Sequence, residues 1–90
     1  MDTIHKYPVV IDDFQEIVMP ASASLLAFAL QDGDPFLWAR VDTNAHAVRR
    51  RFRLAGTGHP LRITADAKYV GTVIMHGGGL VFHLFDLGGE

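Results

Sequence analysis

The loop Gly56-Thr57-Gly58-His59-Pro60 contains the residue types in this chain that are best suited to bind a small anion. Its two glycines free the backbone to point successive amide groups toward one position, as anion-binding turns do. Thr57 adds a hydroxyl, and His59 adds a ring nitrogen that can donate a hydrogen bond. The residues predicted to bind such a ligand are Thr57, Gly58, His59, Arg51, Arg53 and Arg62.

The same loop is also typical of a tight turn, with Pro60 fixing the exit and His59 packed against a sheet. A phosphate-binding loop has more glycines, a lysine and a following helix. This loop has none of those features, so the sequence leaves both interpretations open.

The sequence indicates neither a metal site nor a catalytic centre. The five histidines are His5, His46, His59, His76 and His83, and no two of them have a spacing typical of metal ligands. His83 lies among apolar residues, and we expect it to be partly buried and bonded to Thr72. No cysteine is present, the serines lack the context of a nucleophile, and the aspartates fall at turns, where they serve the backbone. We therefore expect no metal, no cofactor and no enzymatic activity.

Half of the eight basic residues lie within five positions, at Arg49, Arg50, Arg51 and Arg53. Three of them share one face of a strand, which we expect to be solvated or to meet a partner. Nucleic-acid binding is not expected, because it calls for exposed aromatic side chains and a basic balance. The net charge is −2. The aromatic residues Phe36, Trp38, Phe52, Phe82 and Phe85 occupy positions typical of a core.

Length and composition predict a single domain spanning residues 1–90 that self-associates. Hydrophobic residues make up 49% of the chain and charged residues 20%, which is more apolar surface than a monomer of this size hides easily. The absence of cysteine suits a reducing compartment such as the cytoplasm. The longest apolar run, Leu25 to Leu30, is too short to span a bilayer, so no membrane segment is expected.

Short apolar runs separated by turn residues predict an all-β fold. The expected strands are Ile4–Val10, Gln15–Met19, Ser24–Gln31, Pro35–Asp42, Val48–Ala55, Tyr69–His76 and Leu80–Asp86. The Asp32-Gly33 pair favours a hairpin in which Ala29 faces Phe36 and Ala27 faces Trp38, although leucine and alanine also permit a helix before it. The predicted fold is a small antiparallel β sandwich or barrel-like sheet of about six or seven short strands, with room for one short helix.

The last two strands form a hairpin with two largely apolar faces. Alternation puts Tyr69, Val73 and Met75 on one face, and Thr72 directly across from His83 on the other. The second face needs a second layer or another subunit to cover it, most economically in a two-fold dimer. The residues predicted to form this interface are Val70, Ile74, Val81, His83 and Phe85.

Five segments together resemble a family of small uncharacterised bacteriophage proteins that carry a domain of unknown function. The matching segments are Ile4–Pro8, Leu37–Ala39, Gly56–Pro60, Lys68–Val73 and Leu80–Phe85. The resemblance implies a phage or prophage origin, the cytoplasm of an infected or lysogenic host, and a β-rich fold, but no catalytic residues. Small phage proteins commonly bind host proteins, so we expect a non-enzymatic accessory protein that binds a host or phage protein in host takeover or counter-defence. The alternative is a homo-oligomer that binds a small anion such as a nucleotide signal through the Gly56–Pro60 loop.

Overall fold

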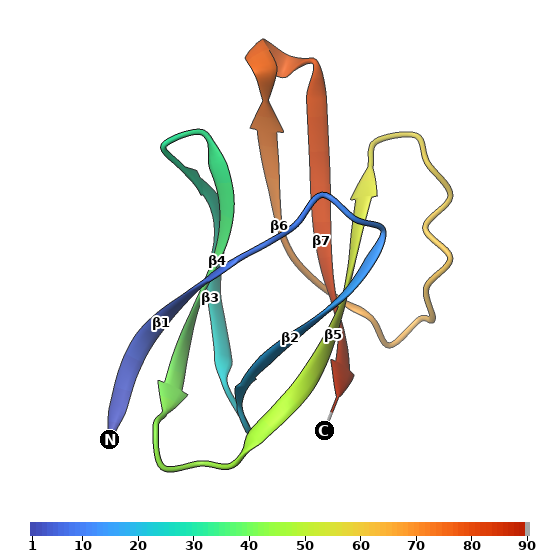
Figure 1. Ribbon diagram of the computed structural model, residues 1–90. Coiled ribbons are helices and arrows are strands. Elements are labelled where there is room, and N and C mark those ends of the chain that lie inside the picture. The colour runs from blue at the N-terminus through green and yellow to red at the C-terminus, as the bar shows by residue number, and fades with distance from the viewer. Residues whose placement is uncertain (90) are drawn as a thin grey trace.

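Seven short segments form β-strands in the structure of residues 1–89, a computed structural model (Figure 1). The strands are β1 (Asp2–Pro8), β2 (Phe14–Pro20), β3 (Ser24–Gln31), β4 (Asp34–Asp42), β5 (Ala47–Gly56), β6 (Lys68–Met75) and β7 (Leu80–Gly89). A single 3-10 turn, η1 (His76–Gly78), connects β6 to β7. The predicted all-β fold is therefore confirmed.

The strands form two antiparallel sheets that pack as a sandwich. One sheet has the order β1-β4-β3, and the other has the order β2-β5-β7-β6. The sheets come close where β3 lies beside β6, and a Cβ added to Gly71 would lie only 3.2 Å from the Cβ of Phe28. No backbone ladder joins β3 to β6 in the part of the chain that the structure describes, so the sheets do not close into a barrel.

The Asp32-Gly33 hairpin has the predicted form. Both residues have positive φ, at 52° and 84°, as a two-residue turn between twisted strands requires. Ala29 faces Phe36, and Ala27 faces Trp38. Residues 24–31 are therefore a strand and not a helix, with a bulge between Leu25 and Ala27.

Alternation along β4 decides which aromatic residues are buried. Leu37, Ala39 and Val41 point into the core, so Phe36 and Trp38 point outward and are only half-buried. The rings of Phe36 and Trp38 lie 6.0 Å apart in an edge-to-face arrangement. The prediction that Phe36 and Trp38 are core residues is wrong, because they occupy the opposite phase of the strand.

The core lies between the two sheets and takes side chains from both. Its largest fully buried members are Phe52, Met19, Leu37, Leu84 and Val41. Phe28 and Val73 extend it toward the line where β3 meets β6, while Phe82 packs against its side. No helix within residues 1–89 is long and apolar enough to cross a membrane.

Candidate functional site: the outer face of the β6–β7 hairpin

A bulge in β6 determines which side chains appear on the outer face of the C-terminal hairpin. The register runs from Tyr69 opposite Phe85 directly to Gly71 opposite Leu84, which leaves Val70 without a partner. Since an extra residue reverses the alternation, Tyr69 joins the outer face and Val70 packs against the core. The predicted faces of Tyr69 and Val70 are therefore wrong, and Val70 does not lie on the outer face.

The outer face now consists of Tyr69, Thr72, Ile74, Val81, His83 and Phe85, and we call these six residues the hairpin face. The ring of Tyr69 meets that of Phe85 edge to face, with centroids 5.7 Å apart. Ile74 lies opposite Val81 at the end nearer η1. The hairpin face contains no Asp, Glu, Lys or Arg.

A chain of hydrogen bonds runs across the hairpin face and reaches the Gly56–Pro60 loop. The hydroxyl of Tyr69 lies 2.5 Å from Thr72 Oγ1, which lies 2.9 Å from Nδ1 of His83. Nε2 of His83 lies 2.7 Å from Oγ1 of Thr57. The predicted contact between Thr72 and His83 is confirmed. Two further residues belong to this series of hydrogen bonds: the Gly56–Pro60 loop brings Thr57 to His83, and the bulge brings Tyr69 to Thr72.

Among residues 1–89, the hydrogen-bond partners of the His83 ring are the two threonine hydroxyls and no acidic side chain. A neutral imidazole donates from one nitrogen and accepts at the other, and the two threonine hydroxyls can meet both needs. In the part of the chain that the structure describes, no carboxylate contacts this histidine as one does in a catalytic triad. No group of three or more His, Asp or Glu side chains within residues 1–89 is arranged to hold a metal ion.

Arg53 does not belong to a solvated strip, which corrects the expectation for that residue. It is only 4% exposed, while Arg49 and Arg51 are exposed as expected. Its guanidinium donates to the carbonyls of Pro60 and Leu61, at 2.8 and 2.9 Å. Additional bonds reach the carbonyls of Asp13 and Leu54, and the Asp13 carboxylate lies 3.2 Å away. Arg53 thus ties the connection between β5 and β6 to the connection before β2.

The predicted ligand-binding residues are spread over several surfaces. Thr57 points toward His83, but the ring of His59 lies over Gly56, 3.2 Å from where a Cβ would stand. The amides of Thr57 and His59 already donate to the carbonyls of Val81 and Gly56. Arg51 and Arg62 are exposed, and among residues 1–89 no hydrogen bond joins any two of Thr57, Gly58, His59, Arg51, Arg53 and Arg62.

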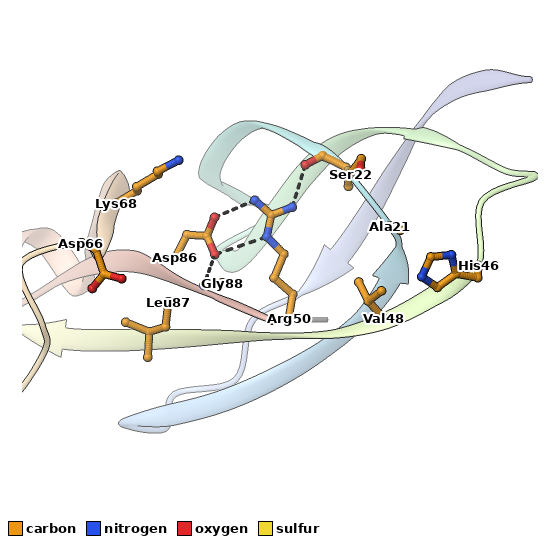
Figure 2. Close-up of a pocket in the computed structure, with 12 residues that line it drawn as sticks. Ala21, Ser22, His46, Val48, Arg50, Asp66, Lys68, Asp86, Leu87 and Gly88 are labelled. Atoms are coloured by element: carbon orange, nitrogen blue, oxygen red, sulfur yellow. Dashed lines mark hydrogen bonds and ion pairs between the residues drawn. The ribbon is translucent and has the colours of Figure 1, made fainter.

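A groove of about 660 Å³ opens at the end of the sandwich near the carboxyl end of β7 (Figure 2). Arg50 reaches across it and donates to Asp86, with Nη2 2.6 Å from Oδ2 and Nε 3.2 Å from Oδ1. Arg50 Nη1 also donates to the carbonyl of Ala23, at 2.6 Å. The ion pair therefore links β5 and β7 of one sheet to the start of β3 in the other.

Opposing influences act on the pKa of Asp86. Burial raises it, but hydrogen bonds from Arg50 and from the amide of Gly88, with the charges of Arg50 and Lys68, outweigh burial and lower the pKa overall. Asp86 is thus held as a carboxylate at neutral pH. Sequence reasoning missed this site, because Asp86 and Arg50 lie 36 residues apart and no local pattern connects them.

Comparison with known proteins gives one match. The family model described as Domain of unknown function (DUF7352) matches residues 1–90. No curated protein and no solved structure matches the chain.

Proposed function

The chain belongs to the family described as Domain of unknown function (DUF7352), and we propose that it is a non-enzymatic module that binds another protein through the hairpin face. The observation that supports this proposal is the exposure of large apolar side chains there. Tyr69 is 61% exposed and Ile74 is 62% exposed, beside the half-buried Val81 and Phe85. Large exposed apolar side chains gathered on one face of a small protein are typical of an interaction surface.

The polar groups of the hairpin face do not prevent a protein partner from covering it. Thr72 and His83 are already bonded within the chain, so a partner can cover them without leaving a buried donor or acceptor unsatisfied. Burying the exposed part of a side chain such as Ile74 contributes roughly 1–2 kcal/mol. The partner surface that fits is apolar and uncharged, with a polar group opposite the Tyr69 hydroxyl.

We also propose a phage or prophage origin, which rests on the resemblance of five segments of the sequence to small bacteriophage proteins. On this proposal the chain acts in the cytoplasm of an infected or lysogenic bacterium and binds a host or phage protein there. Host takeover and counter-defence are the roles that such binding serves.

Affinity capture from several bacterial hosts tests the proposal. The baits are the wild type, Ile74→Asp on the hairpin face, and Leu26→Asp, a matched exposed leucine on the other sheet. We expect the wild type and Leu26→Asp to retain one protein near a one-to-one ratio, and Ile74→Asp to lose it. Failure to retain any protein across the hosts, or equal retention by Ile74→Asp, would overturn the proposal.

A second candidate function is the binding of a small anion such as a nucleotide signal at the Gly56–Pro60 loop, where Thr57 and His83 bring a hydroxyl and an imidazole together. Gly58 has a φ of 87° in this loop. The amides of Thr57 and His59 on either side of it already donate to carbonyl groups, so the Gly58 amide is the one that would bind the anion. Arg53 weighs against this candidate, because its donors are taken by carbonyl groups. A nucleotide present at 100 times its Kd would stabilise the protein by about 2.7 kcal/mol. If no nucleotide raises the Tm, or if His59→Ala leaves the rise unchanged, this candidate fails.

A further inference from the structure

The outer edge of β2 presents backbone groups that have no partner. In an antiparallel ladder, successive residues point their amide and carbonyl alternately toward and away from the neighbouring strand. The amide of Leu54 donates to the carbonyl of Asp13, and the amide of Ala21 donates to the carbonyl of His46. These two bonds show that the odd-numbered residues of β2 point their backbone amide and carbonyl groups toward β5. Phe14, Glu16 and Val18 point both backbone groups away from β5, where no strand within residues 1–89 pairs with them.

The β1 edge of the three-stranded sheet, which does not face the other sheet's edge as β3 does, carries more charge than the β2 edge. The amide of Val9 donates to the carbonyl of Pro35 across from it, so the residues of β1 whose backbone groups point away from β4 include Asp2, Ile4 and Lys6. Charged side chains on an edge strand discourage pairing with another chain. Asp2 is already bonded to Arg40, and the ammonium of Lys6 lies over the ring of Phe36. A second chain pairing at β1 would therefore lie against the charged side chains of Asp2 and Lys6.

The β2 edge has one charged side chain, Glu16, between exposed apolar side chains. Val18 is 59% exposed and Phe14 is 49% exposed, both on the outer face. The preceding connection presents Val10 and Ile11, each more than half exposed. This connection is held firmly, because the Gln15 amide donates to the Val10 carbonyl and its oxygen accepts from the Val10 amide. A preorganised edge loses little conformational freedom when it pairs.

We propose that two copies of the chain pair along β2 in an antiparallel two-fold dimer centred on Ile17. In this register, Glu16 exchanges two backbone hydrogen bonds with Val18 of the second copy, and Val18 exchanges two with Glu16 of the second copy. Phe14 of each copy donates one more to the carbonyl of Pro20 in the other, which makes about six bonds in all. Phe14 then lies beside an apolar proline ring, and Glu16 lies opposite an uncharged side chain.

The neighbouring registers are less favourable. A two-fold axis at Glu16 places two carboxylates directly opposite each other on the same face, which is destabilising. An axis at Val18 pairs each Glu16 with a proline, which has no amide hydrogen, and loses about two bonds. Charge and hydrogen bonding therefore select the axis at Ile17.

The dimer joins two four-stranded sheets into one continuous sheet of eight strands. Because the two-fold axis is perpendicular to the sheet, both hairpin faces end on the same side. This inference does not depend on the proposed function, since β2 and the hairpin face lie at opposite edges of the sheet.

Disulfide trapping tests the register in a chain that has no cysteine of its own. Ile17→Cys places two thiols across the two-fold axis at a non-hydrogen-bonded pair, where Cα atoms are about 4.5 Å apart. This separation is within the range that a disulfide spans. Phe14→Cys is the control, because the two copies of residue 14 lie about 20 Å apart in this register. We expect mild oxidation to convert Ile17→Cys to a covalent dimer and leave Phe14→Cys uncrosslinked, and the opposite pattern would overturn the proposal.

Sedimentation equilibrium gives a second test that leaves the core intact. Val18→Lys adds a charge to the β2 edge, and Ile4→Lys adds the same charge to the β1 edge at a residue of equal exposure. We expect the wild type and Ile4→Lys to be dimers, and Val18→Lys to weaken dimerisation at least tenfold. A monomeric wild type, or dimers lost in Ile4→Lys and kept in Val18→Lys, would refute pairing at β2.

Discussion

Asp86 and Arg50 form the ion pair through which the two sheets are linked at the open end of the sandwich. Replacing Asp86 with Asn keeps the size of the side chain and removes its charge. The amide retains one oxygen for Arg50 or for the amide of Gly88, but its NH2 group faces a guanidinium that cannot accept a hydrogen bond. Arg50 then keeps its bond to the carbonyl of Ala23 and loses its counter-charge.

The structure sets the expected magnitude. The side chains of Arg50 and Asp86 are 19% and 8% exposed, so water screens the pair weakly. Breaking a buried pair from one side costs about 3–5 kcal/mol. Because Arg50 keeps some exposure and one carbonyl partner, we expect Asp86→Asn to lower the free energy of unfolding by about 2–3 kcal/mol. For a domain of this size the urea midpoint falls by roughly 2–3 M.

Urea unfolding followed by the fluorescence of Trp38, the single tryptophan, measures this loss. The matched control is Asp2→Asn, which breaks an ion pair to Arg40 with the same 2.6 Å contact but side chains 54% and 64% exposed. An exposed pair contributes about 0–1 kcal/mol, so the control should change stability little. If both substitutions cost the same, burial does not set the strength of these pairs and the reasoning is refuted.

The pH dependence gives an independent check on Asp86. Its pKa is lower in the folded chain than in the unfolded chain, where a free aspartate has a pKa of about 3.9. The pair therefore contributes its full stability above that pH and loses it as the pH falls through the lower, folded-state pKa. The difference between wild type and Asp86→Asn should be constant near pH 7 and shrink below about pH 4. A difference that persists unchanged at pH 2 would contradict this account.

Three further substitutions test other parts of the structure. Arg53→Ala removes the donor that holds the carbonyls of Pro60 and Leu61, so we expect a loss of about 2–4 kcal/mol and faster amide exchange in residues 57–62; unchanged exchange would contradict this role. Gly71→Ala adds a Cβ 3.2 Å from the Cβ of Phe28, and thermal unfolding should show a loss of about 1–3 kcal/mol, whereas no loss would mean that the sheets separate easily there. Thr72→Val removes the middle of an exposed hydrogen-bond chain and should cost at most about 1 kcal/mol in urea, with a larger loss indicating that the chain stabilises the fold.

The strands and their local pairing could be predicted because nearby residues determine them. Asp32-Gly33 supports a two-residue turn, and that turn alone aligns Ala29 with Phe36 and Ala27 with Trp38. Thr72 could be placed opposite His83 in the same way, since the two strands follow each other along the chain. These features depend on turn chemistry and on the two-residue period of a strand.

Tertiary structure alone decided which side of each strand is buried and what covers it. Alternation along β4 separates Trp38 from Leu37, but only the position of the second sheet makes Leu37 the buried residue. The bulge at Val70 reverses the phase of β6 without a mark in the local pattern, and Arg53 is buried because a loop folds back over it. A repeating pattern determines the period of a strand, whereas its phase and its neighbours depend on segments far away in the sequence.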